Sequence, residues 1–238
     1  MIYAGILAAG LGKRMNRQDL PKQFLPLGDK PLIVNTLEQF YINPSVNRVI
    51  LVVPEEWKLF TEDMIKQYDN MNTEIHIITG GKNKALSINM IVDFISETWG
   101  ITADDILIAH DGVRPFVTQR IIDENIDATK ECGMSVTAGV TNDTILVSED
   151  GDNVSSFPDK MKMLAEQTPL TFRLELLHDL YERAKEENIQ LEKETELGRL
   201  CLKFGYDMKI VYGDSSNMKI ITPYDLKIAN ALLSEKKL

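Results

Sequence analysis

The sequence predicts an α/β fold built on one doubly wound, mostly parallel sheet of the Rossmann-like kind. Over the first 140 residues, short apolar segments alternate with longer segments of helical period. The run Val49-Ile50-Leu51-Val52-Val53 is apolar at every position, as expected for a strand that helices cover on both faces. A chain of 238 residues can form such a domain without a disulfide or a structural metal ion.

This alternation assigns the elements of the first part of the chain in order. The predicted strands are Ile2–Leu7, Arg48–Val53, Glu74–Thr79, Asp105–His110 and Ser135–Val140. The predicted helices are Pro31–Phe40, Glu55–Tyr68, Lys84–Glu97 and Thr118–Cys132. Strands joined through helices of this length form right-handed βαβ units, so we expect them to run parallel.

The pattern changes after residue 140. Two extended stretches, Thr144–Ser148 and Val154–Phe157, flank the turn signal Glu149-Asp150-Gly151-Asp152, which predicts a β-hairpin. We therefore expect a projecting hairpin arm over residues 141–166. The remaining predicted elements are helices over Arg173–Glu187 and Thr195–Phe204, a strand over Met208–Tyr212 and a last helix from Thr222-Pro223.

Composition restricts the expected partners. The net charge is −10, from 36 Asp and Glu against 26 Lys and Arg. This balance argues against nucleic acid or an acidic membrane as partner, although a few cations in one pocket can still bind a small phosphorylated molecule. Cys132 and Cys201 lie far apart, as free thiols, and no apolar stretch approaches the ~18 residues of a membrane span. With no signal-peptide pattern at the N-terminus, we expect a cytoplasmic protein with one domain over residues 1–238.

The loop after the first predicted strand is the main candidate site, because open parallel sheets bind ligands at the carboxyl ends of their strands. In Leu7-Ala8-Ala9-Gly10-Leu11-Gly12-Lys13-Arg14, small residues allow backbone N–H groups to approach a ligand, and two cations can bind phosphate oxygens. A dinucleotide fingerprint would need glycine at Met15, and a P-loop from Gly5 would need lysine at Leu11. The loop therefore predicts a phosphate site of another type, with a turn that binds no ligand as the alternative.

A second motif follows closely in Leu20-Pro21-Lys22-Gln23-Phe24-Leu25-Pro26-Leu27-Gly28. Pro21 restricts the backbone just before Lys22 and helps to fix the direction of its ammonium group. The pair of motifs, L-A-A-G-x-G-x-R-M and then P-K-Q-F-L, resembles the cytidylyltransferases that activate small polyol phosphates. The resemblance continues to the C-terminus. It implies transfer of CMP from CTP to a polyol phosphate, with release of pyrophosphate.

The resemblance also implies a nucleotide site. The segment from Gly80 to Ser87 resembles the family's G-G-x-x-R-x-x-S, which recognises cytosine, with Lys84 in place of the usual arginine. His110-Asp111-Gly112-Val113-Arg114-Pro115 resembles H-D-A-x-R-P, whose aspartate helps to hold Mg²⁺ on the triphosphate, while His110 itself ends an apolar strand and is expected to be structural. The implied nucleotide-binding residues are Leu7, Ala8, Ala9, Gly10, Gly12, Lys13, Gly80, Gly81, Lys82, Ser87, Asp111 and Gly112, with Asp111 as the metal ligand.

The catalytic residues that the resemblance implies are cations. Asn217-Met218-Lys219 begins a segment that resembles N-[IL]-K-[IV]-T-x-x-[DE]-L, whose lysine contacts phosphate. A phosphomonoester is already an anion near neutral pH, so alignment and charge neutralisation matter more than a general base. The implied catalytic residues are Arg14, Lys22 and Lys219. The implied acceptor-binding residues are Arg114, Thr144, Lys160, Thr195 and Glu196, and the arm over residues 141–166 implies a homodimer.

Departures from the family pattern bear on the acceptor. Lys160 stands where the methylerythritol enzyme has arginine, Ser216 stands where it has an acidic residue, and Leu170 replaces a glutamine. The opening segment Ile2–Leu7 and the closing segment Thr222–Ala231 resemble the ribitol-phosphate branch, and the departures at Lys160 and Ser216 disfavour the methylerythritol branch. Together they favour D-ribitol 5-phosphate, which would give CDP-ribitol for teichoic acid or a cell-wall polysaccharide. The alternative acceptor is 2-C-methyl-D-erythritol 4-phosphate of isoprenoid synthesis. A nucleotide-binding relative without turnover is a further alternative, which the retained cations and Asp111 disfavour.

Overall fold

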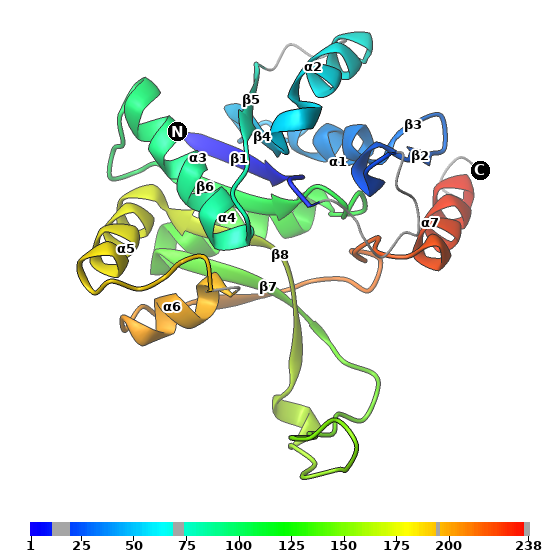
Figure 1. The fold of residues 1–238 in the computed structure, drawn as a ribbon, viewed down its shortest axis with the longest axis vertical. Helices are drawn as coiled ribbons and strands as arrows, with labels where there is room; N and C mark the ends of the chain where they lie inside the picture. The colour runs from blue at the N-terminus through cyan, green and yellow to red at the C-terminus, as the bar shows by residue number, and fades with distance from the viewer. Residues whose placement is uncertain (11–19, 69–73, 194–195, 236–238) are drawn as a thin grey trace.

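The computed structural model describes residues 1–10, 20–68, 74–193 and 196–235 of the chain. Its centre is a seven-stranded sheet in the order β5-β4-β1-β6-β8-β7-β9 (Figure 1). The strands are β1 (Ile2–Leu7), β4 (Arg48–Val53), β5 (Ile75–Thr79), β6 (Ile106–Asp111), β7 (Met134–Val140), β8 (Leu164–Arg173) and β9 (Lys209–Tyr212). All neighbours pair in parallel except β8, which is antiparallel to both β6 and β7. The predicted doubly wound, mostly parallel sheet is confirmed.

Helices cover both faces of this sheet. The helices are α1 (Leu32–Tyr41), α2 (Lys58–Gln67), α3 (Lys84–Trp99), α4 (Gln119–Cys132), α5 (Leu174–Glu186), α6 (Leu197–Lys203) and α7 (Pro223–Glu235). Short 3-10 turns lie at Lys22–Phe24, Glu55–Trp57 and Lys160–Lys162, and a two-stranded ribbon pairs β2 (Pro26–Leu27) with β3 (Lys30–Pro31). Among the described residues, no helix is long and apolar enough to span a bilayer.

Alternation along the strands divides the core into two layers. On β4, Ile50 and Val52 pack with α3, α5 and α6 on one face of the sheet. Val49, Leu51 and Val53 pack with α1, α2 and α4 on the other face. Successive strand residues point to opposite faces, so a strand covered on both sides must be apolar throughout. The continuous apolar run of this strand is therefore explained by its position inside the sheet.

Strand β8 was missed by the sequence analysis. Its segment contains Pro169, and a proline has no N–H to donate to a neighbouring strand, so the sequence is typical of a loop. The structure places β8 in the interior of the sheet all the same. The ladder with β6 ends at Leu170, and the register with β7 shifts between Val136 and Ala138, so the proline lies where regular pairing is interrupted. The carbonyl of Pro169 accepts a hydrogen bond from the Thr137 hydroxyl at 2.8 Å.

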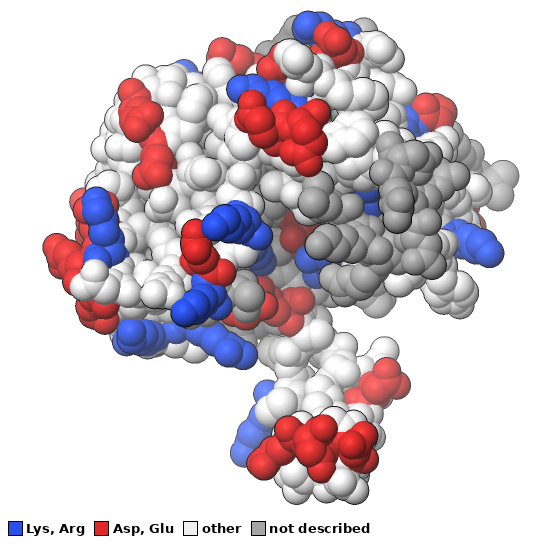
Figure 2. Space-filling view, in the orientation of Figure 1, with Lys and Arg blue, Asp and Glu red and all other residues white. Residues whose placement is uncertain are grey.

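The expected arm is present as a projecting segment over residues 141–163, between β7 and β8 (Figure 1). The arm was predicted at approximately 141–166, and residues 164–166 at its end already pair with β7 as the start of β8. The two predicted extended stretches are joined antiparallel, but only by an isolated bridge between Val147 and Ser156 and not by regular strands. The turn is instead held by Asp150, whose carboxylate accepts hydrogen bonds from the backbone N–H groups of Asp152 and Asn153. Acidic side chains gather at the tip of this segment (Figure 2).

Candidate active site

The carboxyl ends of β1 and β6 lie side by side, with Leu7 paired to Asp111. The chain proceeds from β1 to β4 on one side and later to β6 on the other, so this is the switch in strand order at which open α/β sheets bind ligands. A first cavity of about 220 Å³ and a second of about 650 Å³ open here. Lys84, Asp111 and Lys219 line both cavities, and we call these three residues the shared wall.

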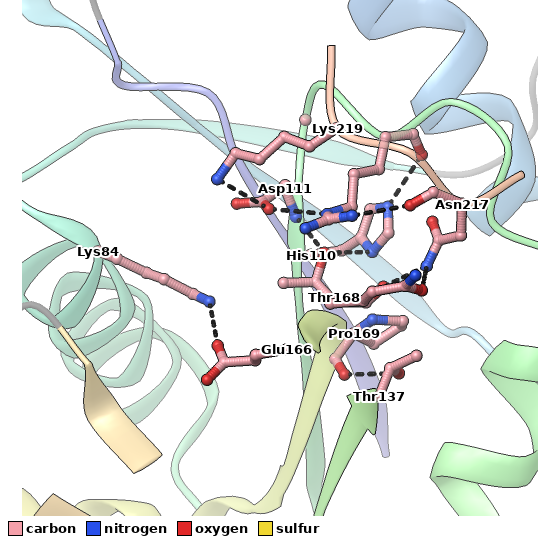
Figure 3. Close-up of polar contacts among 12 residues, drawn as sticks. Lys84, His110, Asp111, Thr137, Glu166, Thr168, Pro169, Asn217 and Lys219 are labelled. Carbon is pink, nitrogen blue, oxygen red and sulfur yellow. Dashed lines mark hydrogen bonds and ion pairs between the residues drawn. The ribbon is translucent and has the colours of Figure 1, made fainter. Parts of the chain in front are cut away.

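Asp111 is the centre of charge in the shared wall (Figure 3). Its Oδ2 accepts a hydrogen bond from Arg114 Nε at 3.0 Å and pairs with Lys219 Nζ at 3.1 Å. Burial by itself would raise the pKa of this carboxyl, but Lys219, Lys84 and Arg114 outweigh burial and hold the pKa well below its usual range. The carboxylate is therefore ionised, and it keeps a group of cations at the carboxyl edge of the sheet.

His110 and Thr168 fix the backbone on which this carboxylate stands. The Thr168 hydroxyl accepts a hydrogen bond from the Asp111 N–H at 3.1 Å and lies 3.1 Å from His110 Nδ1. His110 Nε2 lies 3.1 Å from the Arg114 carbonyl, which can only accept. We therefore assign a neutral imidazole with the proton on Nε2 and with Nδ1 accepting from the threonine. Burial lowers the pKa of His110 to about 4, which agrees with a structural rather than an acid–base role.

Lys219 is placed by its neighbour Asn217. The backbone carbonyl of Asn217 accepts a hydrogen bond from Arg114 Nη1 at 2.7 Å. Its side-chain amide donates to the Thr168 carbonyl at 2.9 Å and to Gln167 Oε1 at 3.0 Å. This residue thereby joins the segment after β9 to β8 and to the loop after β6, and it brings the Lys219 ammonium to Asp111.

The floor of the first cavity is formed by the start of the β1 loop. Leu7, Ala8, Ala9 and Gly10 line it, as the sequence analysis expects. Gln23 is buried, and its side-chain amide donates to the Ala8 carbonyl at 2.7 Å, so the P-K-Q-F motif clamps the loop while Lys22 lines the cavity.

Gly80 and Gly112 lie beneath the β1 loop and line neither cavity. A Cβ at Gly80 would overlap Ala9, and one at Gly112 would come within 3.2 Å of the Ala8 Cβ. These two glycines were predicted to bind nucleotide. The structure gives both a packing role, because only a residue without a side chain allows the loop to approach so closely, and their contact with a nucleotide stays a prediction.

The turn before α3 forms the opposite wall of the first cavity. Ser87 Oγ accepts a hydrogen bond from the Gly81 N–H at 3.1 Å, and Asn83 caps the helix by accepting from the Leu86 N–H at 2.9 Å. Gly81, Lys82 and Ser87 all line the cavity. Backbone groups in a rigid turn at the N-terminus of a helix suit recognition of a base edge or an anion.

The remaining predicted residues fall in three places. Arg114 and Glu196 line the second cavity. Thr144 lies on the projecting segment and lines neither cavity, and the same holds for Lys160, whose Nζ donates to the Asn142 carbonyl. The predicted residues Gly12, Lys13, Arg14 and Thr195 lie outside the described residues.

Several residues of the site were missed from the sequence. Gln23 belongs to the P-K-Q-F motif, in which a role was expected for Lys22 alone, and no role was expected for Thr168. Glu166 and Arg199 line the second cavity, and neither stands in a motif that identifies it. Leu170 replaces a family glutamine, and it is buried in the core and lines neither cavity.

The donor set at the shared wall bears on metal binding. In the ranges that the structure describes, no group of three or more His, Cys, Asp or Glu side chains could enclose a metal ion. Mg²⁺ needs no such cage when one carboxylate and the substrate's phosphates supply its ligands. Both described contacts of the Asp111 carboxylate use Oδ2, so Oδ1 is the atom that fits a metal ion of this kind.

Comparison with known proteins agrees with this architecture. Residues 2–235 match the family described as IspD, 2-C-methyl-D-erythritol 4-phosphate cytidylyltransferase. A 4-diphosphocytidyl-2C-methyl-D-erythritol synthase from Anaerococcus prevotii is similar at a TM-score of 0.79 and 26% identity, over 98% of this chain and 96% of that one. A 2-C-methyl-D-erythritol 4-phosphate cytidylyltransferase from Francisella tularensis is similar at a TM-score of 0.79 and 25% identity, over 97% of this chain and 98% of that one. The Thermus thermophilus enzyme, at 22% identity and a TM-score of 0.75, supports the fold.

The neutral state of His110 gives a testable dependence of stability on pH. Its pKa is lowered from 6.5 to about 4 in the folded protein, so the unfolded chain takes up the proton first as the pH falls. The stability that comes from the neutral imidazole is therefore lost as the pH falls from about 6.5 to about 4. From about pH 7 to about pH 5 the loss from this group amounts to about 2 kcal/mol. His110→Gln keeps a donor for the Arg114 carbonyl but does not titrate.

Urea unfolding of the protein without ligands, at both pH values, measures this effect. We expect the decrease in unfolding free energy to be about 2 kcal/mol smaller in His110→Gln than in the wild type. Equal decreases in the two proteins would show that His110 is not held neutral.

Proposed function

Because the chain belongs to the IspD family of CTP-using cytidylyltransferases, we propose that it transfers the cytidylyl group of CTP to the phosphate of a short polyol phosphate. The observation that carries this proposal is the pair of cavities with one shared wall. The first has the loops for a nucleotide, and the second is large enough for a small acceptor. Lys84, Asp111 and Lys219 lie where the two ligands would meet.

The nucleotide would occupy the first cavity. Its cytosine would lie against the turn of Gly81 and Ser87, where backbone groups and a held hydroxyl can match the base edge. Buried donors and acceptors left unpaired by a wrong base would disfavour that base. The triphosphate would lie along the β1 loop beside Lys22. Asp111 would hold Mg²⁺, which supplies charge neutralisation to the phosphates when it is bound.

The reaction needs little proton transfer. A phosphate oxygen of the acceptor attacks the α-phosphorus of CTP, the bond from that phosphorus to the bridging oxygen breaks, and pyrophosphate leaves with the electron pair. The nucleophile is already an anion near neutral pH. The work of the protein is therefore to align two anions and to neutralise the charge on the α-phosphate and on the leaving group. Lys22 and Lys219 line the first cavity and are the described cations that we assign to this work, with Arg14 as a further proposal from the resemblance.

Two acceptors remain as candidates. The family description and the names of the two structures at 25–26% identity support 2-C-methyl-D-erythritol 4-phosphate rather than the D-ribitol 5-phosphate that the sequence analysis favoured. We therefore take methylerythritol phosphate as the first candidate. Ribitol phosphate stays as the second, because Lys160 and Ser216 depart from the methylerythritol pattern. Asp214 lies beside Ser216, whose N–H it binds at 2.8 Å, so an acidic group is still present there.

Pyrophosphate release from CTP and Mg²⁺ with a panel of polyol phosphates tests the function. We expect one of the two candidate acceptors to give a kcat/KM at least ~10-fold above every other member of the panel, since acceptor groups left unpaired in a buried site are costly. UTP serves as the control nucleotide and is expected to react poorly. CTP binding without release for any acceptor would contradict the proposal and would favour a binding protein without turnover.

Lys22→Ala tests the assignment of the catalytic cations. Loss of one preorganised cation that acts on developing charge is expected to lower kcat by ~10²-fold or more. Unfolding by urea should change little, because this side chain lines a cavity. Lys66→Ala, at an exposed lysine of α2, is the matched control and should keep wild-type turnover. Near-normal kcat in Lys22→Ala would remove this lysine from the mechanism.

We further propose that the projecting segment pairs two copies of the chain. It exposes large apolar side chains, among them Phe157 at 65% and Met161 at 90%, and such surfaces on small soluble proteins mark contact sites. Thr144 and Lys160 lie on the same segment and line neither cavity of their own chain, so they could serve the partner's second cavity.

Light scattering tests this pairing. We expect a dimer at micromolar concentration for the wild type and a monomer for Phe157→Asp, which places a charge in the apolar contact. Glu149→Ala, on the acidic tip, is the control and should remain a dimer. A monomeric wild-type protein would contradict the proposal.

A further inference from the structure

Lys84 stands at a position that does not favour a cation. It is the first residue of α3, and the first turn of this helix has no acidic residue. The N-terminus of a helix carries partial positive charge, so a lysine there is unfavourable unless an anion is close. The side chain is 22% exposed, so water screens its ammonium group only partly. The position is therefore explained by the anions that surround it.

The described anions around this ammonium are two. Lys84 Nζ lies 3.4 Å from Glu166 Oε1, on the neighbouring strand β8 (Figure 3). It is also one of the three cations that hold the pKa of Asp111 low. An N–O separation of 3.4 Å is longer than the 2.7–2.9 Å of a good charge-assisted hydrogen bond. With Glu166 at 42% exposure, this pair positions the ammonium group without binding it tightly, so the ammonium group can also contact a phosphate.

The two cavities meet at this residue. Lys84 lines both of them, whereas Glu166 lines only the second. The second cavity has three other described cations. Arg199 does not line the first cavity, Arg114 is bound to Asp111 Oδ2 and to the Asn217 carbonyl, and Lys219 is paired with Asp111. Lys84 differs from all three, since it lines both cavities and its ion pair is with the partly exposed carboxylate of Glu166.

We propose that Lys84 is a further catalytic residue, whose ammonium group lies between the α-phosphate of CTP and the phosphate of the acceptor, and that Glu166 is the positioning residue that holds it at the shared wall before the ligands bind. This inference rests on the proposed function. Two phosphate anions must approach within bonding distance, and their repulsion opposes the reaction. A cation already held between them reduces this repulsion without reorganisation at the moment of reaction.

Steady-state kinetics with the better acceptor test the role of Lys84. We expect Lys84→Met to lower kcat by ~10- to 100-fold with a change of less than about 3-fold in the KM for CTP, because the ammonium acts on charge in the transition state. Lys84→Arg, which keeps the charge, should return kcat to within ~3-fold of wild type. Lys185→Met, on the exposed face of α5, is the control and should leave kcat unchanged. A kcat within about 2-fold of wild type in Lys84→Met would overturn the inference.

A double-mutant cycle tests the role of Glu166. Glu166→Gln should lower kcat about 3- to 10-fold in the wild-type background, since the ammonium is no longer held in place, and should have no effect in the Lys84→Met background. Equal effects in both backgrounds would show that Glu166 does not act through Lys84. Melting temperatures of all variants identify any that are misfolded, in which case Lys84→Arg and Glu166→Gln still decide the outcome.

Failure of this inference differs from failure of the proposed function. Pyrophosphate release by the wild type together with unchanged kcat in Lys84→Met would reject the role of Lys84 and leave the function standing. Absence of release by the wild type with every acceptor would reject both.

Discussion

The ionised carboxylate of Asp111 is the interaction on which the rest of the site depends. Burial disfavours a negative charge, so this carboxylate persists only because Lys219, Lys84 and Arg114 surround it. The negative charge of the carboxylate also offsets the mutual repulsion of these three cations. A protein with a net charge of −10 thereby presents a local group of positive charge at the carboxyl edge of its sheet, where phosphate ligands can bind.

This carboxylate is placed by segments that are far apart in the sequence. Its N–H donates to Thr168 on β8, and the Arg114 that binds it also binds the Asn217 carbonyl beyond β9. His110 completes the arrangement as a neutral imidazole between Thr168 and the Arg114 carbonyl. A buried hydrogen-bonded network of this kind is rigid, and loss of one member leaves its partners unpaired. The position of Lys219 thus depends on the hydrogen bonds of its neighbour Asn217 as well as on its own ion pair with Asp111.

The sequence predicted the first half of the fold closely. Ile2–Leu7 and Arg48–Val53 were placed at their observed bounds, because apolar runs and helical periods are local signals. Strand β8 was missed because Pro169 is typical of a loop. The structure shows that β7 and β8 pair on both sides of a register shift, and this shift lets the strand accommodate the proline. The end of the arm was predicted only approximately for the same reason, because the pairing of residues 164–166 depends on a partner strand that local pattern does not reveal.

The sequence by itself determined which residue types stand near the site: a glycine-rich loop after β1, a lysine in P-K-Q-F, an aspartate at the end of β6 and a lysine near the C-terminus. These are residue types at fixed spacings, and spacing is a property of the sequence. Only the tertiary structure decided that Lys84, Asp111 and Lys219 line both cavities. It also decided that Gly80 and Gly112 pack beneath the β1 loop and that Glu166 faces Lys84. The physical reason is that charges act through distance in space, and side chains 27 to 135 positions apart become neighbours only when the sheet brings α3, β6, β8 and the segment after β9 together.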